Sequence, residues 1–173
     1  MTRNKTQNFE KMTDITIAVN DGNQDVLDVC QNIKLLCAKL HHFYAELFKD
    51  DRTSLLLWKR TAMEEENNAK EFALITKLRR QNVINSLRVD LVDAKIALIY
   101  LQTLLVRMKE NPPSLEEALR TSIKLADNLS AFQIKNLVEF TDPSFEKLFA
   151  AAVQAEQARI DTLRKTYKQL TGA

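Results

Sequence analysis

Neither glycine nor proline occurs in the 89 residues from 23 to 111 of this 173-residue chain. Glycine and proline are the residues that most often end helices and form turns, so their absence predicts long helices joined by polar turns. Two glycines in the whole chain are also too few for a turn-rich β fold or for glycine-rich phosphate loops. The sequence therefore predicts an all-α protein.

Apolar residues recurring at spacings of four and three predict the individual helices. The first helix should span about 23–48, with the inward stripe Val26, Cys30, Ile33, Cys37, Leu40, Tyr44 and Leu47. The second should begin at Thr53 or Ser54, both good N-caps, and fade near 82–86. Three more should follow at 89–109, 115–140 and 143–170, the fourth opened by a capping box of Ser114 and Glu117. We expect residues 1–22 to form a flexible arm, with weak strand character at 14–17.

The two ends of the chain resemble each other. Trp58 matches Phe149 and Glu65 matches Glu156 at one offset of 91 residues. This pattern predicts a duplicated helical hairpin, 23–86 and 114–171, within a single domain spanning 23–171. A crossover at 87–113 joins the two hairpins. Such an arrangement is a four-helix bundle with a long crossover connection containing an additional helix, the topology of ferritin-like folds.

Composition limits the classes of partner. A formal net charge of +2 gives no reason to expect nucleic acid. The N-terminus lacks the apolar run of a signal peptide, and the longest uncharged apolar stretch, 96–106, is far shorter than the roughly 20 residues of a membrane span. Cys30 and Cys37 lie too far apart on one helix to form a disulfide. We therefore expect a soluble, cytoplasmic protein.

The crossover helix at 89–109 is apolar on nearly every side between Ile96 and Val106. A helix of this kind needs to be covered on all sides, but a four-helix bundle has already filled its own core. The remaining apolar surface predicts a homo-oligomer formed through this helix.

Charged residues lie on two stripes that should point inward. Glu65 falls on the stripe of the second helix, with Asn68 beside it, and Glu156 and Arg159 fall on the stripe of the last helix. Because an unpaired buried charge costs several kcal/mol, each needs a partner or a metal. The alternative is that the stripes rotate slightly and place these residues at the edge of the bundle.

Several short motifs, taken in order and spacing, resemble a rubrerythrin-type ferritin-like domain. They cover about 25–170 and are Phe43-Tyr44-Ala45-Glu46-Leu47, Asp50-Asp51, Leu57-Trp58, Glu64-Glu65-Glu66-Asn67-Asn68-Ala69, Leu115-Glu116-Glu117-Ala118-Leu119 and Ala155-Glu156. The resemblance implies a bundle that holds two metal ions and performs peroxide or oxygen chemistry. Its ligands would be one glutamate and one Glu-x-x-His motif from each half of the bundle.

Most of those ligands are replaced in this chain. The family's first glutamate falls on Cys37, and its counterpart in the second half falls on Ala126, with Asp127 as the nearest acid. The two Glu-x-x-His motifs become Glu65-x-x-Asn68 and Glu156-x-x-Arg159, so two of six ligands remain. The Cys-x-x-Cys iron module of rubrerythrins is also missing.

We interpret Glu65, Arg159 and Glu156 as a salt-bridge core that replaces the metal, with the guanidinium between both carboxylates and a hydrogen bond from Asn68. This interpretation predicts a non-catalytic structural or protein-interaction module without a cofactor.

The alternative is an altered metal site. Cys37, His41, Glu65 and Glu156 together offer donors for one Zn²⁺ or Fe²⁺, which would make the chain a metal-binding oxidoreductase. The fixed positive charge of Arg159 opposes a cation at this place.

Overall fold

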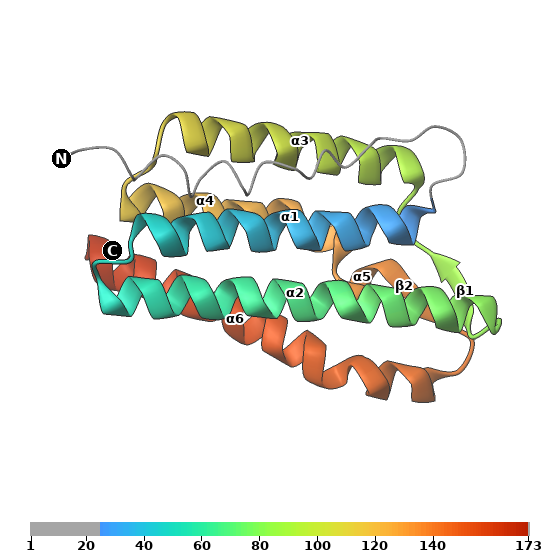
Figure 1. Cartoon of the computed structure of the whole chain (residues 1–173). Coiled ribbons are helices and arrows are strands. Elements are labelled where there is room, and N and C mark those ends of the chain that lie inside the picture. The colour runs from blue at the N-terminus through green and yellow to red at the C-terminus, as the bar shows by residue number, and fades with distance from the viewer. Residues whose placement is uncertain (1–24, 173) are drawn as a thin grey trace.

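The computed structural model describes residues 25–172 and is mostly helical, as the sequence predicted (Figure 1). The expected flexible arm at 1–22 and the strand character at 14–17 lie outside the described residues. The helices are α1 (Val26–Leu47), α2 (Arg52–Arg80), α3 (Leu91–Glu110), α4 (Leu115–Asn128), α5 (Ile134–Leu137) and α6 (Ala150–Thr171). Two short strands, β1 (Ile84–Leu87) and β2 (Val138–Phe140), and two 3₁₀ helices, η2 (Ser130–Phe132) and η3 (Pro143–Phe149), complete the described part of the chain.

The long helices begin at polar caps. Asp51 caps α2 through hydrogen bonds from the backbone N–H groups of Thr53 and Ser54, so the helix begins slightly before the position expected from its hydroxyl residues. Ser114 and Glu117 form the expected capping box at the start of α4. Such caps satisfy backbone donors that have no partner inside the helix.

The α1–α2 hairpin forms the centre of the molecule, and α3 covers the side of α1 that faces away from α2 (Figure 1). On the other side, α6 packs against both α4 and α2. Because α1 lies between α2 and α3, most of its surface is buried. The crossover helix is therefore an outer element of the fold, with one face on α1.

The single helix expected at 115–140 is not present; α4 ends at Asn128 and the chain then turns irregularly. Asparagine and serine at 128 and 130 favour turns over helix, because their side chains compete for backbone hydrogen bonds. The Asn136 side chain donates to the Ser130 carbonyl at 2.7 Å and closes this turn.

The structure also contains a two-stranded antiparallel sheet, which the sequence did not predict. Its strands lie near the positions where two of the predicted helices should end. β1 pairs with β2 in the register Ile84 to Phe140, Ser86 to Glu139 and Leu87 to Val138, with a bulge between Ile84 and Ser86. Phe140 then stacks on Phe149, at the end of η3. From Pro143 the chain forms a 3₁₀ helix, so α6 begins at Ala150 and the prediction that the last helix begins at 143 is wrong.

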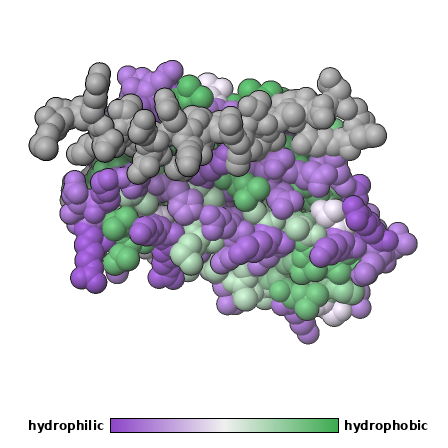
Figure 2. All heavy atoms as spheres, viewed as in Figure 1, coloured by the Kyte–Doolittle hydropathy of each residue, from purple (hydrophilic) through white to green (hydrophobic). Residues whose placement is uncertain are grey.

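The core is one continuous cluster built mainly from α1, α2, α3 and α4, with Trp58, Tyr44 and Phe72 among its largest fully buried side chains. On the face shown in Figure 2, hydrophilic side chains cover much of α2, and apolar ones gather at the lower right, where α6 begins. In residues 25–172, no helix is long and apolar enough to cross a membrane.

Candidate functional site

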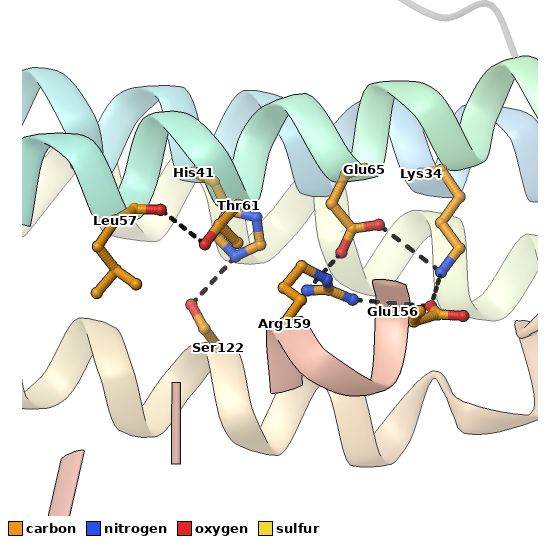
Figure 3. Close-up of polar contacts among 8 residues, drawn as sticks. All are labelled: Lys34, His41, Leu57, Thr61, Glu65, Ser122, Glu156 and Arg159. Atoms are coloured by element: carbon orange, nitrogen blue, oxygen red, sulfur yellow. Dashed lines mark hydrogen bonds and ion pairs between the residues drawn. The ribbon is translucent and has the colours of Figure 1, made fainter. Parts of the chain in front are cut away.

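Four charged side chains meet where α1, α2 and α6 come together (Figure 3). Lys34 comes from α1, Glu65 from α2, and Glu156 and Arg159 from successive turns of α6. Each is less than a tenth exposed. We call these four residues the ion cluster.

The contacts of the ion cluster form a closed ring of alternating charge. Lys34 Nζ lies 2.7 Å from Glu156 Oε1 and 3.7 Å from Glu65 Oε2. Arg159 Nη1 lies 2.8 Å from Glu65 Oε1, and its Nη2 lies 3.7 Å from Glu156 Oε1. Each carboxylate therefore has one close cation and one more distant cation, and the two positive charges balance the two negative ones.

The balance of charge keeps both cations ionised in spite of their burial. Burial alone would lower the pKa of Lys34, but the neighbouring Glu65 and Glu156 carboxylates outweigh it and raise that pKa above 10.5. Burial likewise opposes the charge of Arg159, and the same two carboxylates again raise its pKa. Charges removed from water are tolerated when they are paired in this way.

A small cavity of about 10 Å³ adjoins the ion cluster. It is lined by Lys34, Cys37, His41, Glu65, Ser122, Leu125, Ala126, Leu129, Gln133, Glu156 and Arg159. Three buried polar atoms here have no hydrogen-bond partner among the described residues: His41 Nδ1, Glu65 Oε2 and Arg159 Nε. A cavity of this size is about the smallest that accommodates one water molecule, so it offers no room for an organic substrate.

His41 links α1 to α4 beside this cavity. Its Nε2 lies 3.2 Å from the Ser122 hydroxyl, and its ring stacks on Trp58 with 5.7 Å between the centroids. Burial, with smaller effects from Arg159 and His42, holds the pKa of His41 well below 6.5. The imidazole is therefore neutral near pH 7, and its contacts with Ser122 and Trp58 hold it in place.

The two cysteines are free and buried. Burial raises the pKa of Cys30 to about 12. Burial also raises the pKa of Cys37, and Glu65 adds to that rise. Since the thiolate is the form that attacks electrophiles and binds metals, neither thiol is activated for such chemistry.

The structure brings Glu65, Glu156 and Arg159 together, but not in the predicted geometry. The Arg159 guanidinium does not bind both carboxylates as a fork, because its contact with Glu156 is 3.7 Å long. Lys34 provides the close contact to Glu156 in its place. Asn68 is buried nearby, yet its Nδ2 donates no hydrogen bond within residues 25–172, so the amide does not join the ion cluster.

Ala126, a position carried over from the resemblance, and its acidic neighbour Asp127 have different surroundings. Ala126 lines the cavity, where its methyl group offers no donor atom. Asp127 is exposed and pairs with Arg164 at 2.7 Å on the surface. Asp127 therefore does not take the place of the missing carboxylate.

The four donors of the alternative metal site, Cys37, His41, Glu65 and Glu156, all line the same cavity. Nevertheless, no three histidine, cysteine or acidic side chains of the described part of the chain are arranged to hold a metal ion together. Lys34 and Arg159 already neutralise the two carboxylates, and the Cys37 thiol is protonated. The residues present at this site do not fit the metal centre that the resemblance implies.

Lys34 is the member of the ion cluster that sequence reasoning missed. It lies four residues after Cys30 and three before Cys37, so it falls on the same inward face of α1. A charged residue at an inward position, the same pattern that identified Glu65 and Arg159, could have identified Lys34. Lys34 was missed because the neighbouring Ile33 completes the apolar stripe of α1 without it.

Comparisons of the chain with models of protein families, with curated proteins and with solved structures find no match. What the ion cluster does is therefore inferred from its own charges and contacts.

Proposed function

We propose that this chain is a non-catalytic bundle of the ferritin-like type, in which a buried ion cluster takes the place of a di-metal centre. The observation that carries the proposal is the position of two cations, Lys34 and Arg159, between the carboxylates of Glu65 and Glu156. In a di-metal bundle of this type, inward carboxylates hold the metal ions. Here the same pair of carboxylates already has its counter-charge.

The arrangement of the helices supports the ferritin-like part of the proposal. A helical pair, α1 and α2, is joined through the outer helix α3 to α4 and α6, which pack on each other. Glu65 and Glu156, which occupy matching positions in the two halves of the sequence, face each other across the ion cluster. This is the placement that two ligands from a duplicated hairpin would have.

Electrostatics supports the non-catalytic part. A divalent cation placed beside Lys34 Nζ and the Arg159 guanidinium would meet strong repulsion at low effective dielectric. The neighbouring cavity has room for about one water molecule and none for an organic substrate. These features favour a structural or protein-interaction role.

One observation favours the rival, a metal-dependent oxidoreductase: Cys37, His41, Glu65 and Glu156 line one cavity. Metal analysis of protein purified without chelator separates the two. We expect far less than one equivalent of Fe, Mn or Zn per chain. About one equivalent or more, lost in Glu65→Ala and Glu156→Ala but kept in the surface variant His42→Ala, would establish the rival.

A further inference from the structure

The outer face of α3 carries an apolar seam with no partner among the described residues. Val92, Ile96, Ile99, Tyr100 and Val106 are all about half exposed or more, from 45% for Tyr100 to 65% for Val92. The opposite face of α3, which includes Ala94, Leu98, Leu101, Leu104 and Met108, is buried. The helix that packs against α3 on its buried side is α1 (Figure 1).

The exposed residues follow the spacing of a helix-to-helix contact. Val92, Ile96, Ile99, Thr103, Val106 and Glu110 are separated alternately by four and three residues along α3. This is the a and d pattern by which two helices pack side by side. Five of these six positions carry an apolar or small side chain, and Glu110 closes the seam at its C-terminal end.

Charges flanking the seam decide what fits it. Asp93 lies one position after Val92, near the start of α3, and Arg107 lies one position after Val106, near its end. Both are exposed, and neither forms an ion pair within residues 25–172. In a helix pair, residues at such flanking positions form the ion pairs that set orientation. A second α3 running antiparallel places Asp93 of each copy beside Arg107 of the other.

A parallel pair would lose this complementarity. It would place the two copies of Glu110 against each other and would separate Asp93 from Arg107 by the length of the seam. Lys95 and Lys109 lie on the opposite flank of the seam, where Lys95 is partly buried. The flank with Asp93 and Arg107 is the more exposed one.

We infer that the chain forms a two-fold symmetric dimer in which the exposed faces of two α3 helices pack antiparallel, with Tyr100 near the symmetry axis. The inference extends the interaction role proposed above by naming the partner, a second copy of this chain. It does not depend on the state of the ion cluster: a metal-free monomer would contradict this inference alone, and a metal-loaded dimer would contradict only the proposed function.

Sedimentation velocity over about 1–100 µM tests the self-association, because one helical seam is a small interface expected to give moderate affinity. We expect a monomer–dimer equilibrium for the parent. Ile99→Glu should weaken it at least tenfold, because it buries an unpaired charge at the seam. Met63→Glu, at an equally exposed apolar position of α2, is the matched control and should leave the association unchanged. Circular dichroism checks that each variant keeps its helices.

Charge exchange tests the orientation. Asp93→Arg and Arg107→Asp should each weaken the dimer, because like charges then face each other, and the double variant should recover the parental affinity. Oxidative cross-linking gives an independent reading. Tyr100→Cys should link to itself, whereas two copies of Glu110→Cys would be about 30 Å apart along an antiparallel pair and should not link.

Three results would overturn the inference. The first is a parent that stays monomeric over the whole concentration range. The second is a double charge variant that remains as weak as either single one. The third is cross-linking through Glu110→Cys in place of Tyr100→Cys, which would mean that the helices pack in parallel.

Discussion

Lys34 of α1 and Glu156 of α6 are separated by 122 residues in sequence, yet the lysine Nζ donates a hydrogen bond to Glu156 Oε1 at 2.7 Å. Both side chains are buried, and each also faces a more distant group of opposite charge. The contact joins the first helix to the last and completes the ring of charges. We therefore expect the loss of this contact to destabilise the whole bundle.

Lys34→Met should lower the free energy of unfolding by about 3–5 kcal/mol, because the stem is kept while Glu156 loses its close cation in a buried place. Denaturant unfolding at pH 7 measures this loss. Lys124→Met, at an exposed position of α4, is the control and should change stability by less than about 0.5 kcal/mol. Adding Glu156→Gln to Lys34→Met should restore part of the loss. Strictly additive losses would mean that the two residues do not interact.

The contrast between Glu65 and Lys34 shows how far sequence reasoning reached at the site. Glu65 lies on a narrow apolar stripe of α2, so its charge was conspicuous. Lys34 lies on α1, which is buried against both α2 and α3, and the apolar stripe of such a helix is too broad to make one interrupting charge obvious. The geometry of the pairing, with Lys34 and not Arg159 closest to Glu156, depends on side chains from three helices. Sequence spacing carries no information on it.

For the fold, too, the sequence predicts one part of the structure and not another. The helices up to residue 110 were predictable because residues 23–111 contain neither glycine nor proline. The end of α4 at Asn128 was not, because the segment 129–140 also has apolar residues at helical spacings. Strand β2 forms there because β1 offers it a partner, with Thr141 N–H donating to Val83 O at 2.9 Å at the end of the pair. Pairing with a segment more than 50 residues away overrides local preference.

Arg159→Ala should lower the melting temperature sharply at pH 7, since it leaves Glu65 and Glu156 with only Lys34 between them. Breaking a buried ion network of this kind costs about 3–5 kcal/mol. The loss should shrink near pH 5, because one of two facing carboxyls can then take up a proton. Thermal unfolding of parent and variant across this pH range is the measurement. A variant as stable as the parent at every pH would show that the guanidinium contributes nothing to the bundle.

His41 should make the parent less stable as the pH falls below 6.5. Its native-state pKa is held well below that value, so the unfolded chain binds a proton there that the folded chain does not. The free energy of unfolding of the parent should therefore fall progressively as the pH is lowered from 6.5 toward 5. His41→Gln should lack this part of the pH dependence, and His42→Gln, at the half-exposed histidine beside Glu66, should keep it. Identical pH profiles for the parent and His41→Gln would contradict the assignment.

Equilibrium dialysis with Zn²⁺ tests most directly whether the two cations stand in for metal charge. The parent is compared with Lys34→Met/Ala126→Glu/Arg159→His, which removes both cations of the ion cluster and introduces two of the ligands that the rubrerythrin resemblance implies. We expect the parent to bind no Zn²⁺ that depends on Glu65. The triple variant should bind about one Zn²⁺ per chain, and adding Glu65→Gln should abolish that binding. About one Zn²⁺ per chain in the parent, lost in Glu65→Gln, would contradict the replacement of a metal centre by the ion cluster.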